Sequence, residues 1–248
     1  MLIAAQQLDG SQIEGKDGIV GTLRDILFDG TDWNIRYFEI DTGQWLPGRR
    51  VILPPQIVEN ADYALKRLYT SLSRDQIEQS PTIEQDLPVS RQKEAELAKH
   101  FGWGMAWANL EQRTNQAQAD TNLRSINAIN GYRIQATDGE IGHVTEFIVD
   151  DEGADAGRDE GQGDRPWIIR YLVIDTRNWL PGRQVLIPPV WAEAIHWDSR
   201  KIDLELTREV IENSPEYDPT TSINRRYEEV LYDFYGRPRY WTDYKGVS

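Results

Sequence analysis

Two aspartates in matching sequence contexts are the residues of this chain most suited to proton transfer. Asp41 and Asp175 each end an apolar run and precede a Thr, and a carboxylate in such a position could act as a general acid or base. In the alternative interpretation, the Asp accepts backbone N–H bonds from the following turn and pairs with Arg49 or Arg183. We expect the second, structural role, because the chain offers few other titratable groups that could converge on either carboxylate.

The composition gives little indication of a metal site or of a catalytic nucleophile. The three histidines, His100, His143 and His196, have no metal-ligand spacing to one another, and the chain contains no cysteine. The lack of cysteine excludes disulfides, thiolate catalysis and Cys-type zinc sites. We therefore predict that the protein is not an enzyme and has no catalytic residue, metal site or cofactor.

Both aspartates open a motif that occurs twice, as DTGQWLPGRRVILPP at residues 41–55 and as DTRNWLPGRQVLIPP at residues 175–189. In each copy a Pro-Gly pair fits the central positions of a type II turn, where Pro presets φ and Gly supplies the positive φ. The residues assigned to the structure of these turns are Asp41, Pro47, Gly48, Asp175, Pro181 and Gly182.

A Trp and an Arg flank each turn and have two interpretations. Trp45 and Trp179 either pack against the sheet or remain exposed as contact residues. If exposed, they would combine with Arg49 and Arg183 into the aromatic and Arg composition that is typical of interface hot spots. These four residues are the candidates for an interaction site, and no cofactor-binding residue is assigned.

The repeat extends well beyond the motif, which indicates an internal duplication. Downstream, Ser80-Pro81 matches Ser214-Pro215, and upstream the DGIVG turn at residues 17–21 matches DGEIG at residues 138–142. The second copy has an additional acidic, Gly-rich segment at residues 151–165. We expect a solvated hairpin loop there, since it lacks the ligand order of an EF-hand, although cation binding stays open.

Short β-rich runs dominate each copy and are followed by helices. Runs such as WNIRYFEID and WIIRYLVID suit strands, and the double Pro after the motif ends the return strand. Ser73 and Thr207 are expected helix N-caps, and further helices are expected at residues 90–102 and 224–236. We predict a mainly β fold with two small β-barrels in tandem, over residues 1–107 and 126–248, joined by a polar linker at residues 108–125.

The DGxxG turn, the strand ending in IDT and the WLPGRxVxxPP return together resemble the PRC-barrel domain. This family is named for the H subunit of the photosynthetic reaction centre and also includes a domain of a ribosome maturation factor. The resemblance covers both β-rich copies and implies PRC-type barrels, each followed by short helical segments. It also implies a docking platform for proteins or assemblies rather than a catalyst.

The net charge and the hydropathy of the chain limit the kinds of partner that we expect for it. The formal net charge of −14 disfavours general nucleic-acid binding, and no apolar run is long enough to span a bilayer or to form a signal peptide, so we expect a cytoplasmic protein. The leading hypothesis is a non-catalytic module that docks on an unidentified protein partner or a membrane-associated complex, with homodimerisation left open. The alternatives are a small-ligand or electron-transfer accessory protein and a ribosome-associated RNA-processing factor.

Overall fold

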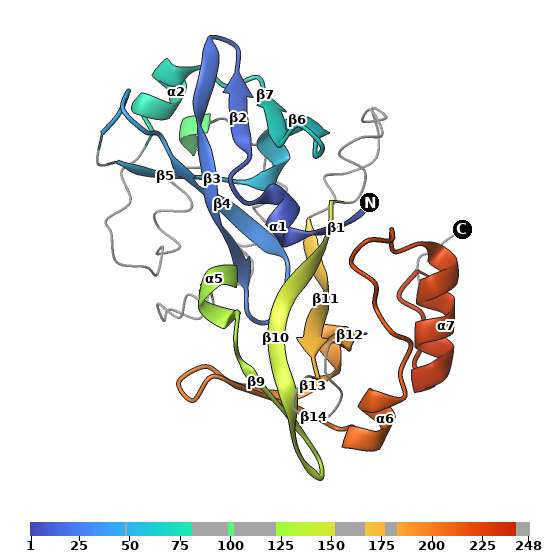
Figure 1. Cartoon of the computed structure of the whole chain (residues 1–248). Coiled ribbons are helices and arrows are strands. Elements are labelled where there is room, and N and C mark those ends of the chain that lie inside the picture. Colours follow the sequence, from blue (N-terminus) through green and yellow to red (C-terminus); the bar gives the residue numbers. More distant parts are fainter. Residues whose placement is uncertain (48, 81–98, 102–122, 152–166, 177–182, 242–248) are drawn as a thin grey trace. The chain divides into compact units, whose positions relative to one another are not determined.

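A computed structural model shows the architecture of the chain (Figure 1). It describes residues 1–47, 49–80, 99–101, 123–151, 167–176 and 183–241. The described strands form two sheets of seven strands each, and the helices are short except for one near the C-terminus. The predicted mainly β fold is therefore confirmed.

The first sheet has the strand order β5-β4-β3-β2-β7-β6, with β8 as a further partner of β3. Its strands are β2 (Gln12–Gly15), β3 (Gly18–Asp29), β4 (Ile35–Asp41), β5 (Arg50–Leu53), β6 (Val58–Asp62), β7 (Arg67–Thr70) and β8 (Leu123–Ser125). Pairs are antiparallel except β2 with β7.

The second sheet has the corresponding order β12-β11-β10-β9-β14-β13, with β1 as a further partner of β10. Its strands are β1 (Leu2–Ala4), β9 (Arg133–Ala136), β10 (Gly139–Asp150), β11 (Ile168–Asp175), β12 (Gln184–Ile187), β13 (Ala192–His196) and β14 (Lys201–Leu204). The one parallel pair, β9 with β14, again occupies the corresponding place. Within the described residues neither sheet closes into a ring, so both are barrel-like rather than complete barrels.

The helices begin where the sequence predicted caps. Ser73 and Gln76 form a capping box at the start of α2 (Arg74–Glu78), and Thr207 caps α6 (Arg208–Glu212). Helix α7 (Arg225–Tyr235) begins after Asn224 and ends at Gly236, whose φ of 61° suits a residue without a side chain. The remaining helical turns are α1 (Ala5–Leu8), α5 (Ile126–Ile129), η1 (Pro55–Ile57) and η3 (Pro189–Trp191). Most of the helix predicted at residues 90–102 lies outside the described residues.

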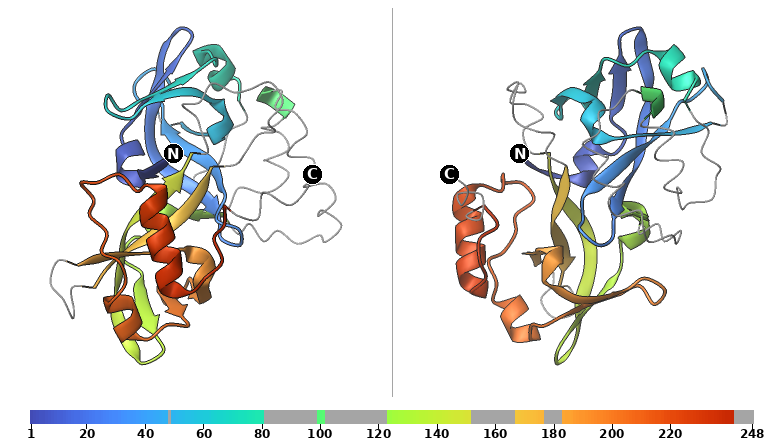
Figure 2. Two further views of the ribbon diagram at one scale, coloured as in Figure 1. Left: turned by 90° about the vertical axis from the view of Figure 1, so that its right-hand side faces the viewer. Right: turned by 180° about the vertical axis from the view of Figure 1, so that it is seen from behind.

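Helix α7 covers one face of the second sheet (Figure 2). Leu231 and Tyr232 of this helix are buried against Tyr171 and Val173 of β11 and against Leu186 of β12. The helical spacing of its aromatic and aliphatic residues therefore has the packing role that amphipathic helices have in globular domains.

The chain forms two compact units that are not continuous in sequence. Unit 1 contains residues 5–128 together with 150–168 and residue 1, and unit 2 contains residues 2–4, 129–149 and 169–248. Leu123–Ser125, which the sequence analysis assigned to the linker, form strand β8 because their backbone completes the edge of β3. The rest of that linker lies outside the described residues, so its assignment stays a prediction.

The last glycine of each DGxxG turn is required by a close backbone approach. A Cβ atom added at Gly142 would lie 2.1 Å from the carbonyl oxygen of Asp175. The equivalent atom at Gly21 would lie 2.7 Å from the carbonyl oxygen of Asp41. The obstructing atoms are backbone at Gly142, whereas at Gly21 the side chain of Ile40, at 2.4 Å, obstructs as well as the backbone, so neither site can accept a larger residue unless its neighbours move.

We expect Gly142→Ala to destabilise the protein by about 1–3 kcal/mol, the usual cost of overpacking a well-packed site. Urea unfolding followed by tryptophan fluorescence measures the loss. Glu140→Ala on the same strand is the matched control, because Glu140 carries a half-exposed side chain and should change stability by less than about 0.5 kcal/mol. Equal stability of the two variants would contradict the close approach.

Candidate functional site

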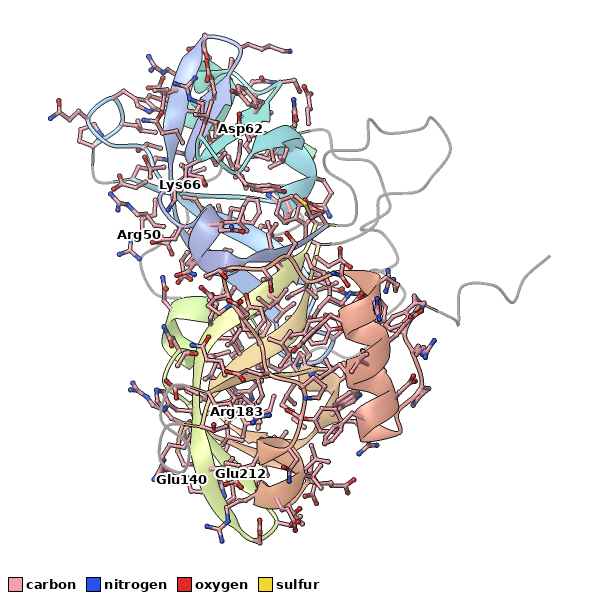
Figure 3. All side chains as sticks on the ribbon, turned by 45° about the vertical axis from the view of Figure 1, so that its right-hand side comes forward. Arg50, Asp62, Lys66, Glu140, Arg183 and Glu212 are labelled. Carbon is pink, nitrogen blue, oxygen red and sulfur yellow. The ribbon has the colours of Figure 1, made fainter. Side chains whose placement is uncertain are left out.

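The arginine of each repeated motif binds the end of a short helix. The Arg49 guanidinium donates to the carbonyl oxygens of Glu78, the last residue of α2, and of Ser80, two residues further on. In the other repeat, Arg183 donates from Nη2 to the carbonyl oxygen of Ser214 at 2.5 Å, and Figure 3 shows its place in unit 2. A cation at the end of a helix satisfies carbonyl groups that have no intrahelical partner. The same bond in both repeats indicates a structural role.

The predicted pairing of Asp41 with Arg49 is wrong. Asp41 accepts the Gly43 N–H at 2.8 Å, as an Asx-type turn requires, but its ion pair is with Arg24 at 3.3 Å. In the strand register Asp41 lies opposite Arg50, which leaves Arg49 on the other side of the strand, where it reaches the helix end. The hydrogen bond from the Gly43 N–H lowers the pKa of the Asp41 carboxyl below its usual value, and Arg24 lowers it by a smaller amount.

Asp175, the counterpart of Asp41, is almost fully buried and lies opposite Gln184 in its sheet. Its neighbour Thr176 donates from Oγ1 to the Arg183 carbonyl oxygen at 3.2 Å, and Thr42 makes the same bond to Arg49 at 3.2 Å. The Thr of each Asp-Thr pair therefore bonds the arginine backbone of its motif in both repeats.

Trp45 lies against the sheet through a specific contact. Its indole N–H donates to the Val20 carbonyl oxygen at 3.0 Å, and the Arg74 guanidinium lies 5.6 Å from the ring centroid. Its side chain is thus half-buried with its polar atom satisfied, which fits the packing interpretation. Pro47 is exposed in the turn. Four further predicted residues lie outside the described ones: Gly48, Trp179, Pro181 and Gly182.

The histidines and acidic residues form no metal site among the described residues. His196 contacts Asp203 at 2.8 Å, and His100 contacts the Gln76 carbonyl oxygen at 2.8 Å. The acidic segment 151–165 lies outside the described residues apart from Asp151, so its cation binding stays untested.

A buried carboxylate, that of Glu228, is the centre of a polar cluster in unit 2. Glu228 of α7 is 2% exposed and accepts hydrogen bonds at Oε1 from Tyr171 at 2.7 Å and from Tyr240 at 2.8 Å. Its other oxygen pairs with Arg225 at 2.8 Å. Burial, reinforced by the Glu228 charge, strongly raises the pKa of the Tyr171 phenol. The cluster fixes α7 on the sheet.

Cations stack on aromatic rings around this cluster. The Arg170 guanidinium lies 4.0 Å from the Tyr240 ring centroid, and that of Arg225 lies 4.3 Å from the Trp241 centroid. Arg239 pairs with Asp233 at 2.8 Å. Arg170, Arg225 and Arg239 are therefore held by intramolecular stacking and ion pairs.

Sequence reasoning missed Glu228, although the repeat contains a signal for it. Glu94 and Arg91 of the first copy correspond to Glu228 and Arg225, and Tyr37 corresponds to Tyr171. A Glu three residues after an Arg on a helix is usually an exposed pair, so the pattern gave no reason to expect burial. Only the packing of α7 shows that the phenol of β11 lies beneath the carboxylate.

The opposite side of α7 carries exposed apolar side chains. Val230 is 53% exposed and Phe234 is 41% exposed, and Arg226 precedes them on the same side. Because residues four apart lie above one another on a helix, these three side chains form one stripe, which we call the α7 stripe. Exposed aliphatic and aromatic residues beside an Arg have the composition of a contact surface.

We expect Arg49→Ala to lower the free energy of unfolding by about 2 kcal/mol, because it removes charged hydrogen bonds to the end of α2. Thermal and urea unfolding measure the change. Arg67→Ala is the control: its side chain is 45% exposed and makes one ion pair with Glu14, whose side chain is 37% exposed, and such a surface pair is worth less than about 1 kcal/mol. If Arg49 served only a partner, its replacement would leave the isolated chain as stable as the control.

Alkaline pH should destabilise unit 2. Burial raises the pKa of Tyr232 and of Tyr235 to about 12, above the ordinary value of 10.0. The folded state therefore favours neutral phenols, so this contribution to stability is complete below pH 10 and disappears as the pH rises towards about 12. Urea unfolding across this range, with tyrosinate absorbance, tests the expectation. Tyr235→Phe should flatten the dependence, and a stability independent of pH up to 12 would contradict it.

A comparison with known protein families gives a match for one part of the chain. Residues 2–77 match the model of the PRC-barrel domain. No curated protein shows significant similarity to the chain. None of the described helices combines the length and apolarity needed to cross a bilayer. The matched stretch runs from β1 into α2, so the resemblance of the turn and strand motif to the PRC-barrel domain is supported for the first repeat.

Proposed function

We propose that the protein is a non-catalytic interaction module that docks on a protein partner, alone or within a membrane-associated complex. The observation that carries this proposal is the α7 stripe, Arg226, Val230 and Phe234. The PRC-barrel match supports a general binding or assembly role for the fold. A cytoplasmic location is part of the proposal.

One side of α7 packs against the second sheet, and we assign docking to the opposite side. Leu231 and Tyr232 face the sheet and are buried, whereas Val230 and Phe234 have no comparable intramolecular cover. Because about half of each side chain is exposed, its position in water gives up roughly half of the 1.5–3 kcal/mol that full burial provides. An amphipathic groove on a partner would recover this energy by the helix-in-groove mode of recognition.

The turn residues are less suited to the docking role than the sequence indicated. Arg49 and Arg183 use their guanidinium groups on the ends of α2 and α6, and Trp45 uses its indole N–H on Val20. These intramolecular bonds would have to break before the polar atoms could serve a partner. We therefore assign docking to the α7 stripe and structure to the turns.

Unit 2 extends the proposed module. Its strand order and its parallel pair correspond to those of unit 1, whose principal repeat matches the PRC-barrel domain. We propose that the second repeat is also a PRC-type barrel and that the chain is a tandem of two. The stripe occurs only in the second repeat, because Gln92, Glu96 and His100 stand at the corresponding positions of the first. Docking is accordingly a property of unit 2.

The double variant Val230→Ser with Phe234→Ser should reduce partner recovery at least tenfold in affinity capture from native-cell lysate with mass spectrometry. This loss corresponds to about 1.4 kcal/mol of binding, which two hot-spot side chains readily supply. Leu65→Ser is the matched control, because Leu65 is 65% exposed and lies in unit 1. Circular dichroism establishes that both variants keep the wild-type fold. Equal recovery of the same partner by both variants would rule out the stripe as the docking surface.

A further inference from the structure

We infer that the two sequence repeats have exchanged their N-terminal strands within one chain, so that each sheet is completed by a strand from the other repeat. Strand β1 belongs to the first repeat by sequence, because the PRC-barrel match begins at residue 2, yet it pairs with β10. Strand β8 precedes α5, β9 and β10 as β1 precedes α1, β2 and β3, yet it pairs with β3.

The pairing of β8 with β3 is extended by side-chain bonds. The strands are antiparallel, with Phe28 opposite Arg124 and Asp29 opposite Leu123. Ser125 donates from Oγ to the Asp25 carboxylate at 2.5 Å. Asn127 then donates from its side-chain amide to the Arg24 carbonyl oxygen at 3.1 Å. Backbone and side chains of the second repeat are therefore matched to β3 of the first.

Apolar packing supports both exchanged strands. Leu123 packs against the cluster of Leu27, Tyr37 and Ile52 in unit 1. In unit 2, Leu2 and Ala4 of β1 pack against the cluster that includes Ile148 and Tyr171, and Figure 1 shows β1 along β10. The exchange is thus reciprocal, and each donated strand adds to the core of the unit that receives it.

The acceptor sites are the unpaired parts of long strands. β2 pairs with the beginning of β3, over Gly18 to Thr22, whereas β8 pairs with its end, over Leu27 to Asp29. An unfilled strand edge exposes N–H and C=O groups that attract other chains. A strand tethered in the same chain fills it at a high effective concentration, which favours exchange within the chain over exchange with a second copy.

Two of the changes between units along the chain occur at short helical turns. The compact units change after residue 4, at the start of α1, and after residue 128, within α5. These turns connect each donated strand to the rest of its own repeat. The separation of the chain into two halves would therefore remove one strand from each sheet.

A disulfide in the full-length chain tests the exchange. Because the chain has no cysteine, Asp29→Cys with Leu123→Cys introduces a single pair at directly opposed strand positions, whose Cα separation of about 4.5–5.5 Å suits a disulfide. We expect an intrachain disulfide, seen as increased mobility on non-reducing gels and as a linked peptide in mass spectrometry. The matched control is Asp150→Cys with Leu123→Cys, because Asp150 is the counterpart of Asp29 on β10 of the second repeat. It should remain reduced.

Each other result overturns the inference. A disulfide in the control pair would place β8 on its own repeat, and a disulfide between two chains would show exchange with a second copy. A folded test variant without any disulfide would show that β8 does not lie on β3.

Should the cysteine variants not fold, hydrogen exchange of the full-length Ser125→Ala variant tests whether β8 pairs with β3. Loss of the bond to Asp25 should accelerate exchange at Leu27 and Phe28 on β3, while Ile148 and Val149 on β10 keep the wild-type rate. Acceleration on β10 instead, or on neither strand, would overturn the inference.

Discussion

Backbone hydrogen bonding along the two longest strands is the constraint on which the rest of the structure depends. β3 and β10 each span 12 residues, longer than any single neighbour among the described strands. β3 meets this demand with three partners. On one edge β2 pairs with its beginning and β8 with its end, and β4 pairs with it from Thr22 to Phe28. Because buried N–H and C=O groups must be paired, a strand of this length requires contributions from distant parts of the chain.

The close packing of these strands determines the small residues of the turn. β3 and β10 pass so near to the following strands that only glycine fits at Gly21 and Gly142. The repeated motif then returns the chain beside β4 and β11, and its arginine binds the end of the next helix. Arg49 and Arg183 thus each have a specific structural task.

Helix α7 combines a structural role with the proposed docking role on opposite sides. Its inner side places Glu228 between two phenols and an Arg, and such a network is favourable only when every partner is present. Its outer side leaves Val230 and Phe234 in solvent. A rigidly anchored helix presents its exposed side chains in a defined geometry, which lowers the ordering cost of binding.

The amino-acid sequence by itself determined the β-rich repeats, the turns, the helix caps and the PRC-barrel resemblance, because these depend on local backbone preferences and on alternation of side chains. Ser73, Asn224 and Gly236 act where local chemistry placed them. The tertiary structure alone decided which residues met: Arg49 bound a helix end rather than Asp41, Glu228 became buried, and Leu123 to Ser125 became a strand. These outcomes depend on which distant edges and faces come together, and no spacing along the chain encodes that proximity.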